Sequence, residues 1–272
     1  MVNKFKFMLM ACAVGISGSA WADAQEEVNK QIAKLIGDAV STRIATSIEP
    51  SAQGQLPNNV WASYSRLTVD PQGSSSIGTD IGVVGYDRDY SKDWVFGAAL
   101  SYNNSNKFNA DGWGIEPYAA YRINKELFAV VRAGYGEFDF NGGSGDARNV
   151  AASLNGVHNF DKIYAQWRAE IGFADSDVHS GGVHTSSSTT NYVGDGELGY
   201  RFGDGLKGFV GLQLSDTNRP DSYFAFARIG LEKELSKDAA ISAKYEGKVD
   251  DGLPKGANMS INTFTIAARM RF

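Results

Sequence analysis

The residues that could do acid–base or metal chemistry gather in one short stretch, "ADSDVHSGGVH", which supplies Asp175, Asp177, His179 and His184. An aspartate beside a histidine can activate water for hydrolysis, and two histidines with two aspartates can bind a metal. The stretch is also rich in glycine and serine, which is typical of a polar turn between strands. We therefore expect a hydrophilic loop tip, with no catalytic residue, no metal and no cofactor. The third histidine, His158, stands apart from this stretch.

The glycine-rich stretches do not indicate phosphate-binding loops. The glycines at 142, 143, 145, 181 and 182 lie in polar stretches that no helix follows, so they indicate turns. A net charge of −5 without a basic stripe argues against a nucleic-acid-binding protein, and no nucleic-acid partner is expected. After residue 25 there is no apolar run of about 18 residues, so no transmembrane helix is expected.

Charged residues recur at every second position along several segments, opposite a set that is apolar. In 163–173, for example, Arg168 and Glu170 alternate with isoleucine, alanine, tryptophan and phenylalanine. Strand side chains alternate between two faces, so each segment has one polar and one apolar face. If the sheet closes into a barrel, the polar face lines its lumen. The lumen-lining charges that we predict are Arg168, Glu170, Glu197, Arg201, Arg228, Glu232, Lys244, Glu246 and Arg269.

These segments belong to a chain whose hydrophobic period is two from Val60 to the C-terminus. Short polar links such as "SKD" and "NKE" alternate with polar links that are mostly longer, such as "GGSGD" and "GGVHTSSS". One end of the sheet should therefore carry tight turns and the other end loops. The pattern predicts about twelve strands, at 59–70, 75–90, 94–106, 110–124, 127–141, 147–161, 163–180, 189–203, 206–219, 223–236, 239–252 and 257–272.

The length of these strands distinguishes a membrane barrel from a soluble β-sandwich. Strands in soluble proteins average about five or six residues, whereas a strand that crosses lipid needs about 9–11. Backbone groups in lipid must all be paired, so the sheet has to close. We predict an all-β fold, an antiparallel transmembrane β-barrel of about twelve strands. The aromatic residues near strand ends that would form its interfacial girdle are Trp61, Trp94, Tyr102, Trp113, Tyr121, Tyr135 and Tyr200.

The first 22 residues have the features of a cleaved signal peptide. Lys4 and Lys6 precede an apolar stretch. The "AWA" that ends at Ala22 fits the small-x-small pattern of a signal-peptide cleavage site. The only cysteine, Cys12, lies inside this segment, so the mature protein is expected to need no disulfide. We infer export to the cell outer membrane of a Gram-negative bacterium.

An amphipathic helix is predicted between the signal peptide and the strands. Val28, Ile32, Leu35 and Ile36 recur at three- and four-residue spacing, and Arg43 lies near the C-terminal end, where the helix dipole favours a cation. Proline and glycine then end the helix. The predicted organisation is a signal peptide at 1–22, a helix that plugs the lumen at 23–48, a linker at 49–58 and a barrel at 59–272.

The chain ends on "TFTIAARMRF", in which every second residue is apolar up to Phe272. We expect this last strand to pair with the first strand and to close the barrel. Outer-membrane barrels as a class commonly end on an aromatic residue that the barrel-assembly machinery reads, and "RMRF" resembles that signal. Phe272 is therefore our candidate assembly signal.

The order of helix, short linker and about twelve strands resembles the β-domain of autotransporters, the translocators of type V secretion. The resembling pieces are "IAKLIGDAVSTRI", "NNVWASYSRLTVD", "IGTDIGVVGYDRDYSKDWVFGAALSYNNSN" and "FTIAARMRF". The resemblance implies a non-enzymatic barrel anchored in the outer membrane with the helix in its pore. Its implied partners are outer-membrane lipids, lipopolysaccharide and the barrel-assembly machinery. No passenger is expected before the helix, and self-cleavage, which uses an Asn pair in that family, is not expected because the helix holds only Asn29.

Other interpretations stay open at this point. The helix could lie on the periplasmic leaflet, because its apolar stripe suits a membrane surface. The barrel could be a small porin for polar solutes, a surface adhesin, or a hydrolase that uses Asp175, Asp177 and His179. The lumen charges could pair with one another across a filled lumen or set the ion selectivity of an open pore.

Overall fold

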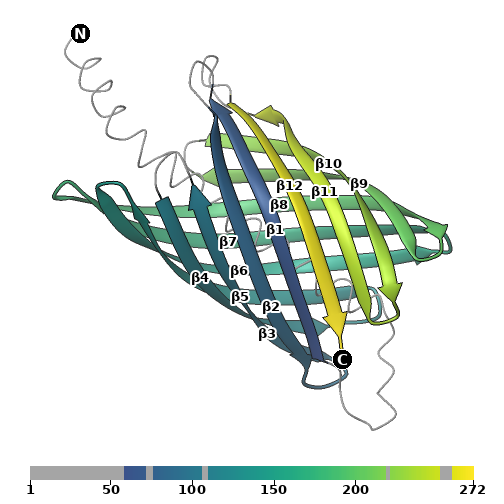
Figure 1. The fold of residues 1–272 in the computed structure, drawn as a ribbon. Helices are drawn as coiled ribbons and strands as arrows, with labels where there is room; N and C mark the ends of the chain where they lie inside the picture. Colours follow the sequence, from purple (N-terminus) through teal and green to yellow (C-terminus); the bar gives the residue numbers. More distant parts are fainter. Residues whose placement is uncertain (1–57, 72–75, 106–109, 219–220, 252–258) are drawn as a thin grey trace.

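The computed structural model describes residues 58–71, 76–105, 110–218, 221–251 and 259–272, which form twelve β-strands (Figure 1). Each strand pairs antiparallel with its neighbours in sequence, as the period-two pattern predicts. The strands are β1 (Asn58–Pro71), β2 (Ile77–Asp89), β3 (Trp94–Ser105), β4 (Ala110–Arg122), β5 (Leu127–Phe140), β6 (Gly143–Phe160), β7 (Ile163–Ser180), β8 (Val183–Gly203), β9 (Leu206–Asn218), β10 (Asp221–Ser236), β11 (Ala239–Asp251) and β12 (Met259–Arg271).

The sheet closes on itself because β12 pairs with β1. At the end of this seam, Asn58 donates to the Phe272 carbonyl at 2.9 Å and Phe272 donates back at 3.0 Å. Inside the barrel, the hydroxyl groups of Ser65 and Thr265 lie 2.8 Å apart across the same seam. The predicted closed antiparallel barrel is therefore confirmed, and the last strand has the closing position expected of it.

The two ends of the barrel differ in the links that they carry. We call the end with Asn58 and Phe272 the terminal end, and it also carries the short turns at 90–93, 123–126, 161–162, 204–205 and 237–238. The opposite end, which we call the far end, carries the two-residue turns at 141–142 and 181–182. The C label in Figure 1 marks the terminal end.

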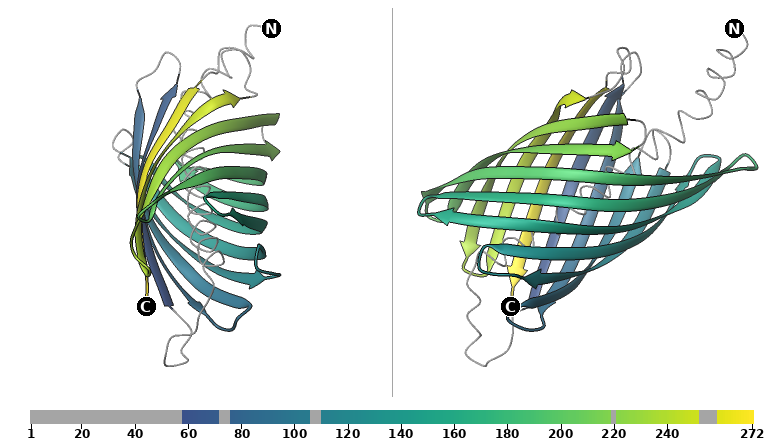
Figure 2. Two further views of the ribbon diagram at one scale, coloured as in Figure 1. Left: turned by 90° about the vertical axis from the view of Figure 1, so that its right-hand side faces the viewer. Right: turned by 180° about the vertical axis from the view of Figure 1, so that it is seen from behind.

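Alternate side chains point to opposite sides of the wall. On β12, Phe264, Ile266 and Met270 are 44–54% exposed, whereas Thr263 and Thr265 between them are 2–3% exposed. The same alternation on the other strands gives the curved wall in Figure 2 an apolar outer surface and a mostly polar lining. An apolar exterior of this kind suits contact with lipid.

The aromatic residues predicted for the girdle point outward with one exception. Trp94, Tyr102, Trp113, Tyr121, Tyr135 and Tyr200 are 36–54% exposed. The prediction is wrong for Trp61, which is 4% exposed and lies inside the barrel. Its ring covers Gly85 on the neighbouring strand, where a Cβ would lie 2.0 Å from the indole Cε2, and its N–H donates to the Tyr118 hydroxyl at 3.4 Å. The Trp61 ring can pack there because Gly85 has no side chain.

Strands β6 and β8 begin four and six residues earlier than the sequence pattern predicts, at 143 instead of 147 and at 183 instead of 189. The polar segments "GGSGD" and "GGVHTSSS", expected as loops, belong mainly to β6 and β8, which begin at Gly143 and Val183. Gly181 and Gly182 have φ of +57° and +82°, and two consecutive residues with positive φ form the tight turn that continues pairing right up to the loop. The hairpins of β5–β8 therefore extend the wall at the far end, where they project in Figures 1 and 2.

The predicted signal peptide, the predicted helix at 23–48 and nearly all of the predicted linker at 49–58 lie outside the described residues. Within the described part of the chain, no helix is long and apolar enough to span a bilayer.

Candidate functional site

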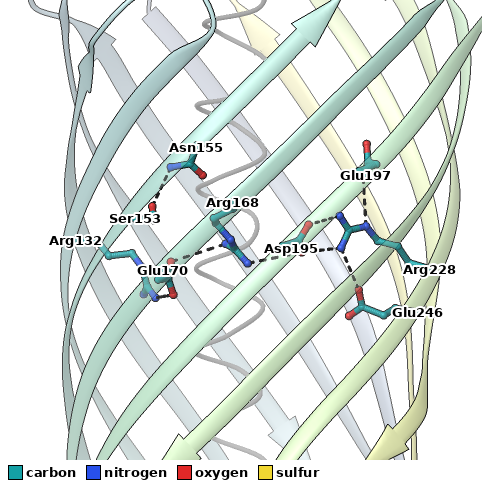
Figure 3. A network of polar contacts seen from close by, with 9 residues as sticks. All are labelled: Arg132, Ser153, Asn155, Arg168, Glu170, Asp195, Glu197, Arg228 and Glu246. Carbon is teal, nitrogen blue, oxygen red and sulfur yellow. Dashed lines mark hydrogen bonds and ion pairs between the residues drawn. The ribbon is translucent and has the colours of Figure 1, made fainter.

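The lumen contains a belt of charged side chains that alternate in sign (Figure 3). Glu170 on β7 lies between two guanidinium groups, 2.7 Å from Arg132 Nη2 and 4.0 Å from Arg168 Nη1. Asp195 on β8 continues the series, 4.0 Å from Arg168 Nη2 and hydrogen-bonded to Arg228 at 2.7 Å. The belt therefore runs without a break from β5 to β10, although it passes over β6 and β9.

Arg228 is the most heavily bonded member of the belt. Besides Asp195, its Nε donates to Glu197 at 3.3 Å and its Nη1 lies 3.8 Å from Glu246. The Arg228 side chain is 3% exposed, and that of Glu246 is 2% exposed. Gly211 on the intervening β9 makes this reach possible, because a Cβ there would lie 2.6 Å from Arg228 Nε. Buried charges need such partners, since an unpaired one costs several kcal/mol.

The other end of the belt is anchored on β4. Arg132 Nη1 donates to Glu116 at 2.7 Å, and the two side chains are 9% and 4% exposed. Glu116 and Glu170 hold the same guanidinium from both sides. This geometry fixes the orientation of the Arg132 side chain across the lumen wall.

A second charged cluster lies nearer the terminal end and borders a cavity. Lys207 lies 3.0 Å from Glu232 and 2.6 Å from Glu234, and Arg269 shares Glu232 at 3.0 Å. These four side chains line a cavity of about 480 Å³, together with Arg201 and Lys244 among others. Polar groups of both signs thus surround a space large enough for a small solute or a segment of chain.

The opposite side of the lumen mixes large apolar side chains with polar ones that are mostly uncharged, such as Ser63, Ser101 and Asn103. Leu67 on β1, Ile81 and Val83 on β2, and Phe128 on β5 point inward and are 0–1% exposed. They belong to one cluster, most of whose members come from β1 to β5. The inward-facing charges on β1 to β3 are Asp87 and Asp89, near the terminal end, within the described residues of those strands. We call this side the apolar strip: Trp61, Leu67, Ile81, Val83, Val95, Ala99, Tyr118, Ala120, Phe128 and Val130.

The nine charges predicted to line the lumen fall into two groups in the structure. Arg168, Glu170, Glu197, Arg228 and Glu246 lie in or beside the belt. Glu232, Arg269, Lys244 and Arg201 line the cavity, where Arg201 donates to the Asp161 carbonyl at 2.8 Å and so ties down a turn.

The predicted set leaves out five members of these networks: Glu116, Arg132, Asp195, Lys207 and Glu234. The period-two rule could have found all five, because each stands an even number of residues from other inward-facing residues of its strand. Their partners could not have been found that way, since Arg228 and Asp195 meet across an intervening strand.

The Asp–His stretch lies on the far-end extension of β7 and β8 instead of a loop. Asp177 accepts a hydrogen bond from Ser186 and lies 3.3 Å from His184 Nε2, while His179 and His184 stack with their ring centroids 4.4 Å apart. His158 lies at the terminal end, 3.2 Å from Glu126. Over the described ranges, no group of three or more His, Cys, Asp or Glu is placed to hold a metal. The predicted plug residues, Val28, Ile32, Leu35, Ile36 and Arg43, lie outside those ranges.

Comparison with known proteins identifies the fold. No protein-family model and no curated protein matches the sequence. Among solved structures, the chain is similar to the β domain of the Bordetella autotransporter BrkA, with 14% identity, a TM-score of 0.59 and coverage of 78% of this chain and 98% of that one. The translocator domain of the autotransporter NalP from Neisseria meningitidis has 12% identity and a TM-score of 0.61, with coverage of 92% of this chain and 98% of that one. An outer membrane channel from Pseudomonas putida F1 has 9% identity and a TM-score of 0.53, with coverage of 83% of this chain and 100% of that one.

At these identities the comparisons establish the fold and no more. They confirm the resemblance that the sequence predicts, and they extend it to a channel. The fold is that of outer-membrane barrels. The chain therefore has the closed twelve-stranded architecture of an autotransporter β-domain.

Proposed function

We propose that this protein is an outer-membrane barrel of the autotransporter translocator type, whose N-terminal helix occupies and closes its lumen. The observation that carries the proposal is the division of the lumen wall into an apolar strip and a charged belt. Leu67, Ile81 and Val83 point into the lumen and are 0–1% exposed. Contact with water alone would be unfavourable for such apolar side chains. An amphipathic helix matches both sides of such a wall.

The predicted helix has the same division. Its apolar stripe of Val28, Ile32, Leu35 and Ile36 suits the apolar strip. Its intervening lysines, Lys30 and Lys34, and the two glutamates that precede the stripe suit the belt. The apolar stripe therefore has a matching surface inside the barrel as well as on a membrane leaflet. A helix body is about 10–12 Å across, which a barrel larger than eight strands can accept.

The position of Asn58 supports the proposal that the linker and helix enter the lumen from the terminal end. Short turns face the periplasm in barrels of this class, so the terminal end, where β1 begins, is the periplasmic end in this proposal. The predicted linker at 49–58 then reaches the lumen directly from the mouth of the barrel. We propose in addition that outer-membrane lipid, lipopolysaccharide and the barrel-assembly machinery are the partners of the folded and folding chain.

Cysteine cross-linking tests the orientation of the helix. In a Cys12→Ser background, Ile36→Cys with Val83→Cys should be joined by a short bismaleimide. The matched control pairs Ile36→Cys with Val84→Cys, the next residue on β2, which points outward and is 55% exposed. Equal yields from the two pairs, or no product from either, would contradict a helix against the apolar strip.

Planar-bilayer recording tests the closure. The intact mature protein should conduct little, and deletion of 25–48 should open a stable channel. Heat-modifiable migration on a gel shows whether the deletion variant still forms a barrel. Unchanged conductance in a folded deletion variant would mean that the helix does not close the lumen.

A second candidate is a channel for polar solutes. The cavity of about 480 Å³ among Lys207, Arg269, Glu232 and Glu234 favours it, as does the similarity of the fold to a channel. Liposome swelling with the intact protein separates the two candidates, because a closed barrel should admit almost no sugar or amino acid. Rapid swelling would favour the channel.

A further inference from the structure

The far-end segment of β8, residues 183–189, is paired on one side only among the described residues. β7 pairs with it along its whole length, from Ser180 opposite Val183 onward. β9 begins to pair with β8 only at Asn191, which lies opposite Thr217. An open strand edge of about 23 Å therefore stands clear of the barrel wall.

The backbone groups on this open side can be assigned from the ladder. Arg201 N–H donates to the Lys162 carbonyl on the β7 side at 2.7 Å. The register between β7 and β8 has no shift, and bonding residues alternate in an antiparallel pair. Odd-numbered residues of β8 therefore bond β7, and His184, Ser186 and Ser188 direct their N–H and C=O groups to the open side.

The usual protections of a strand edge are missing here. Proteins guard open edges with lysine, proline or a bulge. The segment reads "VHTSSST", with no lysine, arginine or proline, and its ladder with β7 is regular. An unguarded edge of β-branched and hydroxyl residues is a template for another extended chain.

The outward face of the neighbouring strands carries strong negative charge. Paired residues share a face, so Asp177 lies beside Ser186 and Asp175 beside Ser188 on the outward face. A strand added to β8 would place its outward side chains about 10 Å from these carboxylates, within reach of lysine or arginine. On the outward face of β4 to β7, the far-end half of the described strands has one Arg or Lys, Arg148, against six acidic side chains: Asp111, Glu137, Asp139, Asp146, Asp175 and Asp177.

We propose that the edge of β8 at residues 183–189 binds an extended peptide by strand addition, and that the peptide carries basic residues at every second position. The main-chain groups of His184, Ser186 and Ser188 form the ladder. The carboxylates of Asp175 and Asp177 select the basic side chains. This surface is separate from the lumen and does not depend on whether the lumen is open.

Fluorescence anisotropy with the full-length protein in detergent micelles tests the proposal. The probe is a labelled seven-residue peptide of alternating threonine and lysine, acetylated and amidated at its ends. Saturable binding is expected, and the S186P/S188P variant should bind at least about tenfold more weakly, because two donors worth about 1 kcal/mol each are removed from the open side. The β7 ladder is left intact because odd-numbered residues form it.

Matched controls separate strand addition from charge attraction. The S186A/S188A variant keeps both N–H groups and should bind as the wild type does. A peptide N-methylated at every residue should lose binding, because neither of its edges can then donate to β8, and a peptide with glutamate for lysine should bind at least about tenfold more weakly. Absence of saturable binding, equal binding by the proline and alanine variants, or full binding of the N-methylated peptide would each overturn the proposal.

Discussion

Arg228 on β10 and Asp195 on β8 are hydrogen-bonded at 2.7 Å inside the barrel, although β9 lies between their strands. The contact exists because Gly211 on β9 has no side chain in the path of the guanidinium. The absence of a side chain at this glycine therefore allows an ion pair between two strands that are not neighbours in the sheet. The same arginine also contacts Glu197 and Glu246, so its one positive charge lies among three carboxylates.

Replacing Arg228 should destabilise the barrel more than replacing an exposed cation. Arg228→Met leaves Asp195, Glu197 and Glu246 close together and nearly buried, which should cost about 3 kcal/mol or more of unfolding free energy. Guanidinium-induced unfolding in micelles measures the loss. Lys237→Met is the control, because Lys237 is 90% exposed and should matter little. Equal stability of the two variants would contradict a structural role for the belt.

The glycine beneath Trp61 gives a second prediction. A Cβ at Gly85 would lie 2.0 Å from the indole, so Gly85→Ala should displace the ring and cost about 1–3 kcal/mol. Gly194→Ala on β8 is the matched control, since no atom lies within 4 Å of a Cβ there. The two variants can be compared by thermal unfolding followed by gel migration. A Gly194→Ala variant that is as unstable as Gly85→Ala would point to backbone effects instead of the ring contact.

The sequence is sufficient to predict the barrel because one rule operates along the whole wall. Two solvents, lipid outside and a polar lumen inside, force the period-two pattern onto every strand, and hydrogen-bond closure then follows in lipid. β3, β5, β7 and β11 accordingly begin at the predicted residues 94, 127, 163 and 239. The prediction fails where that rule no longer applies. Beyond the membrane, "GGVHTSSS" is polar on both faces and looks like a loop, yet it continues β8.

The contacts inside the lumen could not be predicted in the same way. Parity tells which side chains point inward, but pairing depends on which strands lie within reach across the curve of the wall. Trp61 illustrates the limit. Its position near a strand end suggests a girdle residue, and only the register with Gly85 reveals that the ring packs inside.

The terminal residue provides a prediction that separates assembly from stability. The Phe272 backbone closes the seam with Asn58, but its side chain is 62% exposed. Phe272→Ala should therefore change the stability of refolded protein by no more than about 0.5 kcal/mol. If the ring is the assembly signal, the same variant should lower the amount of assembled barrel in cells. Met270→Ala, also exposed and on the same face, is the control. Normal assembly of the Phe272→Ala variant would show that the Phe272 side chain is not the assembly signal.

Protonation of Asp177 should loosen the β7–β8 hairpin at low pH. A hydrogen bond from Ser186, and secondarily the nearby His184, hold the pKa of Asp177 below its ordinary value of 3.8. A lowered pKa in the folded state means that the contact stabilises the hairpin above pH 3.8 and that this contribution is lost as the pH falls through the folded-state value. Carbon-13 NMR of the Asp177 carboxyl group follows the titration directly. In Ser186→Ala the pKa should rise, whereas Thr185→Ala, whose side chain lies on the other face, should leave it unchanged. An identical titration of the wild type and Ser186→Ala would show that the hydroxyl does not set the charge of this carboxylate.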